Sequence, residues 1–176
     1  MRLQEPTESS DANRKQQIRE AGAVSDDHAN VNFPPPLIHL LGGAAGLAMS
    51  VIYPLQIPQL TLLWWLGLGL MSVALILAAM GFREFSQAGN PVPPNRQIEG
   101  LMTGGPFRFS RNPLYLALAL FHAGIALVIA SVWLLLSLIP VLFLVRYYVI
   151  EREEAYLKRR FGQVYLEYQR HVRRWI

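Results

Sequence analysis

Two long stretches of this 176-residue chain, residues 28–82 and 112–145, contain no Asp, Glu, Lys or Arg. About 20 helical residues cross a hydrocarbon layer of about 30 Å, in which a charged side chain costs several kcal/mol. Each stretch therefore has room for two crossings, and no soluble core requires uncharged segments of this length. We expect an all-α integral membrane protein.

Polar turns and reversals divide each stretch into a pair of expected helices. The expected helices cover about residues 37–55, 60–80, 113–130 and 132–150. The first pair is joined by a short turn at 56–59, Ser131 marks the reversal in the second pair, and Pro140 is expected to kink the last helix. A single long helix through each stretch is the competing interpretation, because apolarity alone does not locate a hairpin.

The positions of the 16 Lys and Arg residues favour four crossings. Four precede residue 37, four lie within 81–113, and eight lie from Arg146 onward. Four crossings place all three groups on one face of the membrane, which the positive-inside rule makes cytoplasmic. Two crossings would place the middle group on the opposite face. We therefore expect both termini in the cytoplasm.

Composition limits the partners and the domain organisation. The net charge of +4 comes from cations interleaved with 12 acidic residues beside apolar segments, so anionic lipid headgroups are expected partners and nucleic acid is not. The chain has no cysteine, which excludes disulfides and thiolate nucleophiles, and no metal site is expected. Residues 1–36 are expected to form a disordered tail without a cleavable signal peptide, and 37–176 one domain.

The segment after the last expected crossing has an amphipathic pattern. Between Leu157 and Val172, apolar and aromatic residues recur at spacings of three and four, with charged residues on the other face. This pattern predicts an interfacial helix over about residues 151–172 that lies along the membrane surface. Such a helix could cover a site at the cytoplasmic ends of the crossings.

Asn112 and Pro113 allow two interpretations that are compatible with each other. Asn is a favourable residue before the first turn of a helix, and Pro is favourable at its first position. The same geometry would aim the positive end of the helix, beside Arg111, at a carboxylate or phosphate. Tyr115, one turn further on, could line such a pocket or belong to an interfacial aromatic belt.

Four further side chains are candidates for chemistry. Glu153 and Glu154 either belong to a solvated helix, with Glu154 paired to Lys158, or hold a cationic ligand. Adjacent helical residues point about 100° apart, so at most one of the two should face a pocket squarely. His39 and His122 are the ionisable residues within the expected crossings, and each is either functional or a hydrogen-bonded packing residue.

Several of these segments occur in a recognisable order. They are Ala88–Asn90, Leu101–Tyr115 with Arg111-Asn112-Pro113-Leu114-Tyr115 at its end, the pair Glu153-Glu154, and Phe161–Tyr168. Over about residues 60–175 the chain resembles the isoprenylcysteine carboxyl methyltransferase and phospholipid methyltransferase superfamily, especially its small bacterial members. The resemblance implies methyl transfer from S-adenosylmethionine to a membrane-embedded lipid or prenylated acceptor. The likeness to bacterial members also implies the bacterial inner membrane as the location.

The resemblance also implies site residues. The implied cofactor-binding residues are Gly105, Pro106, Arg111, Asn112, Pro113, Tyr115, Glu153 and Glu154, and of these Arg111, Glu153 and Glu154 are the implied catalytic residues. Asn112 stands where the family usually has histidine. Glu153 or Glu154 would hold the methionine ammonium, while Arg111 and Asn112 hold its carboxylate. The implied substrate contacts are Arg146, Arg170 and Arg173.

The acceptor and the rival functions stay open at this point. Carboxylate O-methylation is favoured, because a carboxylate is already ionised at pH 7 and needs no base. Amine N-methylation requires a base, for which Glu153, Glu154 or His171 is available. The alternatives are an NADPH-dependent enzyme like the sterol reductases and a non-catalytic lipid-binding module, and the oligomeric state is not predicted.

Overall fold

The computed structural model describes residues 29, 31, 33–58, 60–90 and 98–176. Within these residues the regular structure is entirely helical, which confirms the all-α expectation. The helices are α2 (Pro35–Ile52), α3 (Thr61–Gln87), η1 (Gly105–Arg108), α4 (Pro113–Val128), α5 (Val132–Leu144), η2 (Val145–Ile150), α6 (Glu151–Phe161) and α7 (Gln163–His171). Most of the expected tail, residues 1–28, lies outside the described residues.

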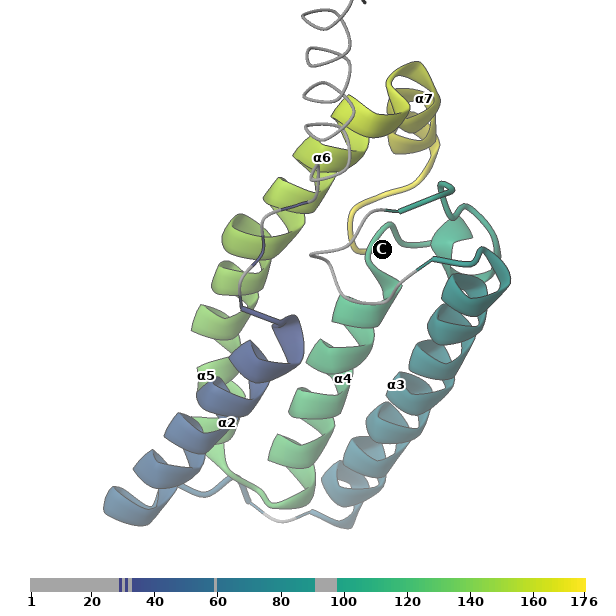
Figure 1. Ribbon diagram of the computed structural model, residues 1–176. Helices are drawn as coiled ribbons and strands as arrows, with labels where there is room; N and C mark the ends of the chain where they lie inside the picture. The colour runs from purple at the N-terminus through teal and green to yellow at the C-terminus, as the bar shows by residue number, and fades with distance from the viewer. Residues whose placement is uncertain (1–28, 30, 32, 59, 91–97) are drawn as a thin grey trace, which may run out of the picture.

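The apolar helices α2, α3, α4 and α5 run side by side (Figure 1). Helix α4 packs between α3 and α5, and α2 packs on α5. Among the described residues, three helices are long and apolar enough to cross a membrane: α2, α3 and the continuous helix Val132–Phe161, which contains α5, η2 and α6. Helix α4 is apolar but has only 16 residues, about 24 Å of helix. These helices indicate an integral membrane protein.

Close approach of the helix backbones depends on glycine. A Cβ atom on Gly46 of α2 would lie 2.9 Å from the Leu134 Cα atom of α5. A Cβ atom on Gly67 of α3 would lie 2.8 Å from the Gly124 carbonyl oxygen of α4. Small residues allow such contacts, which supply packing energy where lipid removes the hydrophobic driving force between helices.

The turns at one end of the bundle interlock. Ser131 precedes α5, and its hydroxyl accepts a hydrogen bond from the Leu134 amide at 3.1 Å. The Ile57 amide donates to the Ala130 carbonyl at 2.8 Å, and the Val132 amide donates to the Leu55 carbonyl at 3.3 Å. These bonds join the turn between α2 and α3 to the turn between α4 and α5.

Helix α3 runs to Gln87, past its expected end at residue 80. Gly81, the first residue past that expected end, is buried inside the helix. A Cβ atom there would lie 2.6 Å from the Leu114 Cδ2 atom, so this glycine permits close packing against α4 and does not end the helix. The last turns of α3 therefore carry Arg83 and Glu84 toward the site end of the bundle.

The segment expected as one interfacial helix over 151–172 is two helices. Helix α6 continues α5 through the π-helical turn η2, and Figure 1 shows the two following one line. The helix breaks at Gly162, whose φ of 52° is unfavourable for other residues, and α7 then runs in a different direction. Around η2 lies a well-buried cluster that includes Val145, Val149, Ile150 and Tyr156.

Candidate functional site

The start of α4 lies beside α6 and the C-terminal segment (Figure 1). Five predicted site residues meet here: Arg111, Asn112, Tyr115, Glu153 and Glu154. Arg111 directly precedes this helix start, and its Nη1 atom lies 3.1 Å from the Glu154 Oε1 atom of α6. The two side chains retain only 12% and 7% of their accessible surface. The structure therefore joins residues 43 positions apart in a buried ion pair.

Arg174 from the C-terminal segment also binds Glu154. Its Nε atom donates to Oε1 at 2.9 Å and its Nη2 atom donates to Oε2 at 2.7 Å. This two-pronged geometry is the strong form of an arginine–carboxylate contact. Both Glu154 oxygens are thus occupied by protein cations. Sequence analysis did not select Arg174, because it follows the similar Arg173 and no spacing distinguishes the two.

The C-terminal segment is tied to the start of α4 by three more hydrogen bonds. The Asn112 side-chain amide donates to the Arg174 carbonyl at 2.9 Å, and the Ser110 hydroxyl donates to the same oxygen at 3.3 Å. The Arg111 backbone amide donates to the Arg173 carbonyl at 2.9 Å. Asn112 does occupy the position before the first turn, with Pro113 following, but its side chain makes no capping hydrogen bond.

Glu153 has a different environment from its neighbour. The Tyr115 hydroxyl donates to Glu153 Oε1 at 2.5 Å. Burial raises the pKa of Glu153 to about 7, the hydrogen bond from Tyr115 opposes this rise, and the charge of Glu154 adds to it. Glu153 therefore lies in α6, past the uncharged part of the long helix, as a carboxylate that titrates near neutral pH.

Arg111 has buried donors that no described residue satisfies. Its Nε and Nη1 atoms are buried, yet neither forms a hydrogen bond with correct geometry, although Nη1 lies close to Glu154. Burial raises the pKa of the nearby Tyr165 hydroxyl to about 12, so this neighbour is uncharged at neutral pH. A buried guanidinium with unsatisfied N–H groups is suited to an anionic ligand.

Gly105 and Pro106 lie in η1, which is held between α3 and α7. A Cβ atom on Gly105 would lie 2.6 Å from the Glu84 Oε1 atom of α3, and the φ of Gly105 is 48°. The Tyr168 hydroxyl of α7 donates to the Phe107 carbonyl at 2.7 Å. Contacts of η1 thus fix one wall beside the start of α4.

The three expected substrate cations do not join this cluster. Arg146, Arg170 and Arg173 are exposed. The Arg146 guanidinium lies 5.4 Å from the Tyr147 ring centroid, and Arg173 contributes its backbone carbonyl. Within the described residues, no group of three or more His, Asp or Glu side chains could hold a metal ion.

His39 and His122 meet inside the bundle, away from Arg111. Their Nδ1 atoms are 3.4 Å apart, and both residues are buried. The His122 Nε2 atom lies 3.2 Å from both the Leu134 carbonyl oxygen and the Ser137 hydroxyl. The pair therefore links α2, α4 and α5 as a polar contact in an apolar interior.

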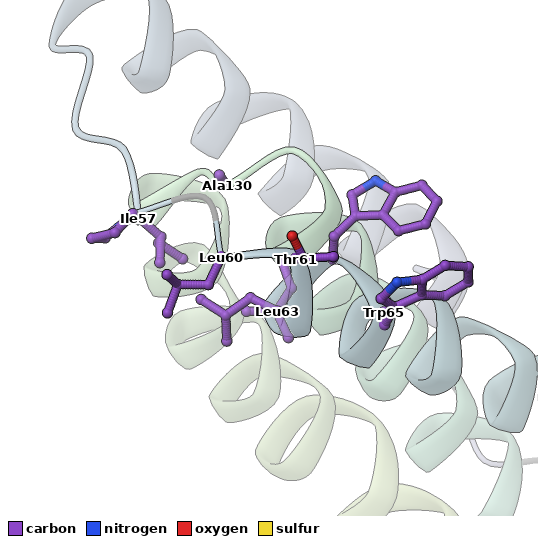
Figure 2. Close-up of a pocket in the computed structure, with 9 residues that line it drawn as sticks. Ile57, Leu60, Thr61, Leu63, Trp65 and Ala130 are labelled. Atoms are coloured by element: carbon purple, nitrogen blue, oxygen red, sulfur yellow. The ribbon is translucent and has the colours of Figure 1, made fainter.

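Two open pockets lie at the opposite end of the bundle. One of about 370 Å³ is formed near Leu60, Trp65 and Ala130 (Figure 2), and one of about 440 Å³ surrounds Trp133. Most of their lining side chains are apolar, and none belongs to the Arg111 cluster. The pockets therefore point to the wrong end of the bundle, and the site is better identified from its buried charged residues.

Apolar helices of membrane length, with buried arginine and glutamate side chains gathered at one end, define a polytopic membrane protein with a polar site. A family model described as phospholipid methyltransferase matches residues 62–164. The chain belongs to this phospholipid methyltransferase family, which confirms the predicted superfamily. Membership implies methyltransferase activity on lipid in a membrane. No curated protein and no solved structure matches the chain.

Proposed function

We propose that this protein is an S-adenosylmethionine-dependent methyltransferase that methylates a membrane lipid at the cytoplasmic rim of its helices. The observation that carries the proposal is the buried Arg111 guanidinium with two unsatisfied donors. The guanidinium lies at the start of α4, next to Glu154 of α6. Tyr115 of α4, the hydrogen-bond partner of Glu153, also lies there. Family membership supplies the class of reaction.

The residues present fit the amino-acid end of S-adenosylmethionine. Its carboxylate needs N–H donors, which Arg111 Nε and Nη1 would supply, and its ammonium needs a carboxylate. Glu154 is occupied by Arg174, so we assign the ammonium to Glu153. Gly105, Pro106, Asn112 and Pro113 would form the adjoining wall.

The bound cofactor would supply a methyl group that is already activated by the sulfonium. Methyl transfer from it is a direct displacement, so the protein must align the reactants and needs no covalent nucleophile. Arg111 and Glu153 would orient one reactant at a fixed place, and the apolar helix ends would hold the lipid beside it. Alignment of the reactants is what a site built from ion pairs and packing contacts can provide.

We further propose that α4 is a fourth crossing, which places both termini in the cytoplasm. The turn between α2 and α3 and the turn between α4 and α5 are joined and uncharged, as expected for the outer side. Helix α6, which carries four Lys and Arg residues, then lies on the inner side with α7 and the Arg111 cluster, in agreement with the positive-inside rule.

The acceptor has two candidates. Carboxylate O-methylation needs no base, as noted above. N-methylation of a phospholipid amine is the second candidate, and the specific observation that favours it is Glu153, whose pKa of about 7 suits a base. The other two bases considered are less suitable, because Glu154 is ion-paired and His171 is exposed. In this case Glu153 would accept the amine proton.

Methyl labelling tests the proposal. The purified protein in liposomes is incubated with methyl-labelled S-adenosylmethionine, with phosphatidylethanolamine in one arm and a prenylated carboxylate in the other. We expect label in the lipid fraction of one arm, lost in Arg111→Gln and retained in Arg160→Gln, which removes an exposed charge of α6. Labelling that is absent in both arms, or unchanged in Arg111→Gln, contradicts the proposal. Consumption of NADPH would favour the reductase alternative.

A further inference from the structure

The C-terminal segment places a cation on one of the two glutamates of the site. Arg174 binds Glu154 through two hydrogen bonds of 2.9 and 2.7 Å, and Glu154 retains 7% of its side-chain surface. The same carboxylate lies 3.1 Å from Arg111 Nη1. Two guanidinium groups therefore share one buried carboxylate.

The sharing is unequal. Arg174 has both aligned hydrogen bonds to Glu154, whereas the Arg111 Nη1 and Nε atoms have none. Without Arg174, Glu154 would be a buried carboxylate with Arg111 as its nearest cation, and a short reorientation would pair them in the two-pronged geometry. The donors of Arg111 would then be used inside the protein.

We propose that Arg174 is a positioning residue, which saturates Glu154 and thereby keeps the Arg111 donors available for the carboxylate of the cofactor. This inference rests on the proposed function. It makes Glu154 part of the support of the site and leaves Glu153 as the glutamate that meets a ligand.

The backbone around Arg174 supports this role. The Asn112 amide and the Ser110 hydroxyl both donate to the Arg174 carbonyl, and the Arg111 amide donates to the Arg173 carbonyl. Thus the residues that flank Arg111 also fix the position of Arg174. The contacts couple the C-terminal segment to the start of α4, which a free tail could not do.

Titration calorimetry with S-adenosylmethionine tests the inference on the detergent-solubilised full chain. We expect Arg174→Gln to raise the Kd roughly tenfold, about the loss of one charge-assisted hydrogen bond. The double variant Arg174→Gln/Glu154→Gln should recover most of this loss, because Arg111 is no longer captured. Arg160→Gln, which removes an exposed charge of α6 away from these contacts, should leave the Kd unchanged.

Each other outcome has a distinct meaning. A Kd that rises further in the double variant means that Glu154 binds the cofactor itself. A Kd that falls in Arg174→Gln means that Arg174 blocks the site. Either result overturns the inference. If Arg174→Gln does not fold, as shown by its thermal transition, Arg174→Lys is titrated, with a roughly threefold increase expected and an unchanged Kd as the contrary result. Failure of the unaltered protein to bind overturns the proposed function as well.

Discussion

Glu153 and Glu154 are adjacent in sequence but chemically different in the structure. Glu154 is held by two arginines, whereas Glu153 accepts a hydrogen bond from Tyr115 and has a pKa of about 7. The π-helical turn η2 ends at Ile150, and α6 begins at the next residue. Because such a turn contains more residues than an α-helical turn, it changes which faces of α6 point toward the site.

The two roles considered for Glu153 give different pH profiles. A carboxylate with a pKa near 7 gains its negative charge as the pH rises from 6 to 8. If Glu153 holds the ammonium, the affinity for S-adenosylmethionine should rise several-fold over this range, and Glu153→Gln should abolish the rise. If Glu153 is the base, the affinity should stay constant while kcat rises. Calorimetry and steady-state kinetics separate the two.

Tyr115→Phe provides a check on the same titration. The hydroxyl stabilises the charged form of Glu153, so its removal should raise the pKa and move the affinity or rate profile to higher pH. A profile that moves to lower pH, or does not move, would show that Glu153 is not the titrating group.

At the scale of single residues, the sequence predicted part of the site. Arg111, Asn112 and Tyr115 could be predicted because they form a compact motif at the start of one helix. Arg174 could not, because its contact with Glu154 depends on how the last residues fold back. The different environments of the two glutamates depend on η2, and no residue type within 145–150 predicts a π-helical turn.

At the scale of elements, Gly162 sets the direction of α7. Its φ of 52° and ψ of −124° are accessible to glycine, and a Cβ atom there would meet no atom within 4 Å. Gly162→Ala should therefore destabilise the protein by about 1–3 kcal/mol through backbone strain alone. Chemical denaturation in detergent measures the change.

Gly69 supplies the matched control for this experiment. A Cβ atom on Gly69 also meets nothing within 4 Å, but Gly69 lies inside α3 with ordinary helical geometry. Gly69→Ala should be neutral or stabilise by up to about 1 kcal/mol. Equal effects of the two substitutions would argue against backbone strain at Gly162.

The histidine contact between helices gives a second prediction at this scale. Replacing His39 or His122 alone by Leu leaves a buried polar partner without its contact, whereas replacing both removes the polar pair. Each single variant should lose about 0.5–2 kcal/mol, and the double variant should lose less than the sum. Additive losses would show that the two rings do not interact.

The limits of sequence reasoning are also clear for the elements. The uncharged stretches and the polar turns located the helices, but the end of α3 was misplaced. The helix was expected to end before Gly81, whereas the packing of Gly81 against Leu114 favours helix. The amphipathic pattern after residue 151 predicted helix, and the segment is helical, yet the break at Gly162 depends on a backbone conformation that hydrophobic spacing does not report.

At the scale of the whole molecule, the number of crossings is the open structural prediction. Three helices, α3, α4 and the helix that begins at Val132, separate Gln56 from Gln163. The chain has no native cysteine, so single variants Gln56→Cys and Gln163→Cys can be labelled with an impermeant maleimide in spheroplasts. With four crossings, Gln56→Cys should be labelled and Gln163→Cys protected until lysis. Labelling of both from one side would show that α4 does not cross.

The account depends on a polar rim that recognises the amino-acid end of S-adenosylmethionine through Arg111 and Glu153. The most direct measurement compares the binding of this cofactor with that of methylthioadenosine, which lacks the amino-acid group, to the unaltered protein and to Arg111→Gln and Glu153→Gln. The account predicts that the unaltered protein prefers S-adenosylmethionine by at least about tenfold, and that each substitution reduces this preference. Equal binding of both compounds, or a preference unchanged in both variants, would contradict it.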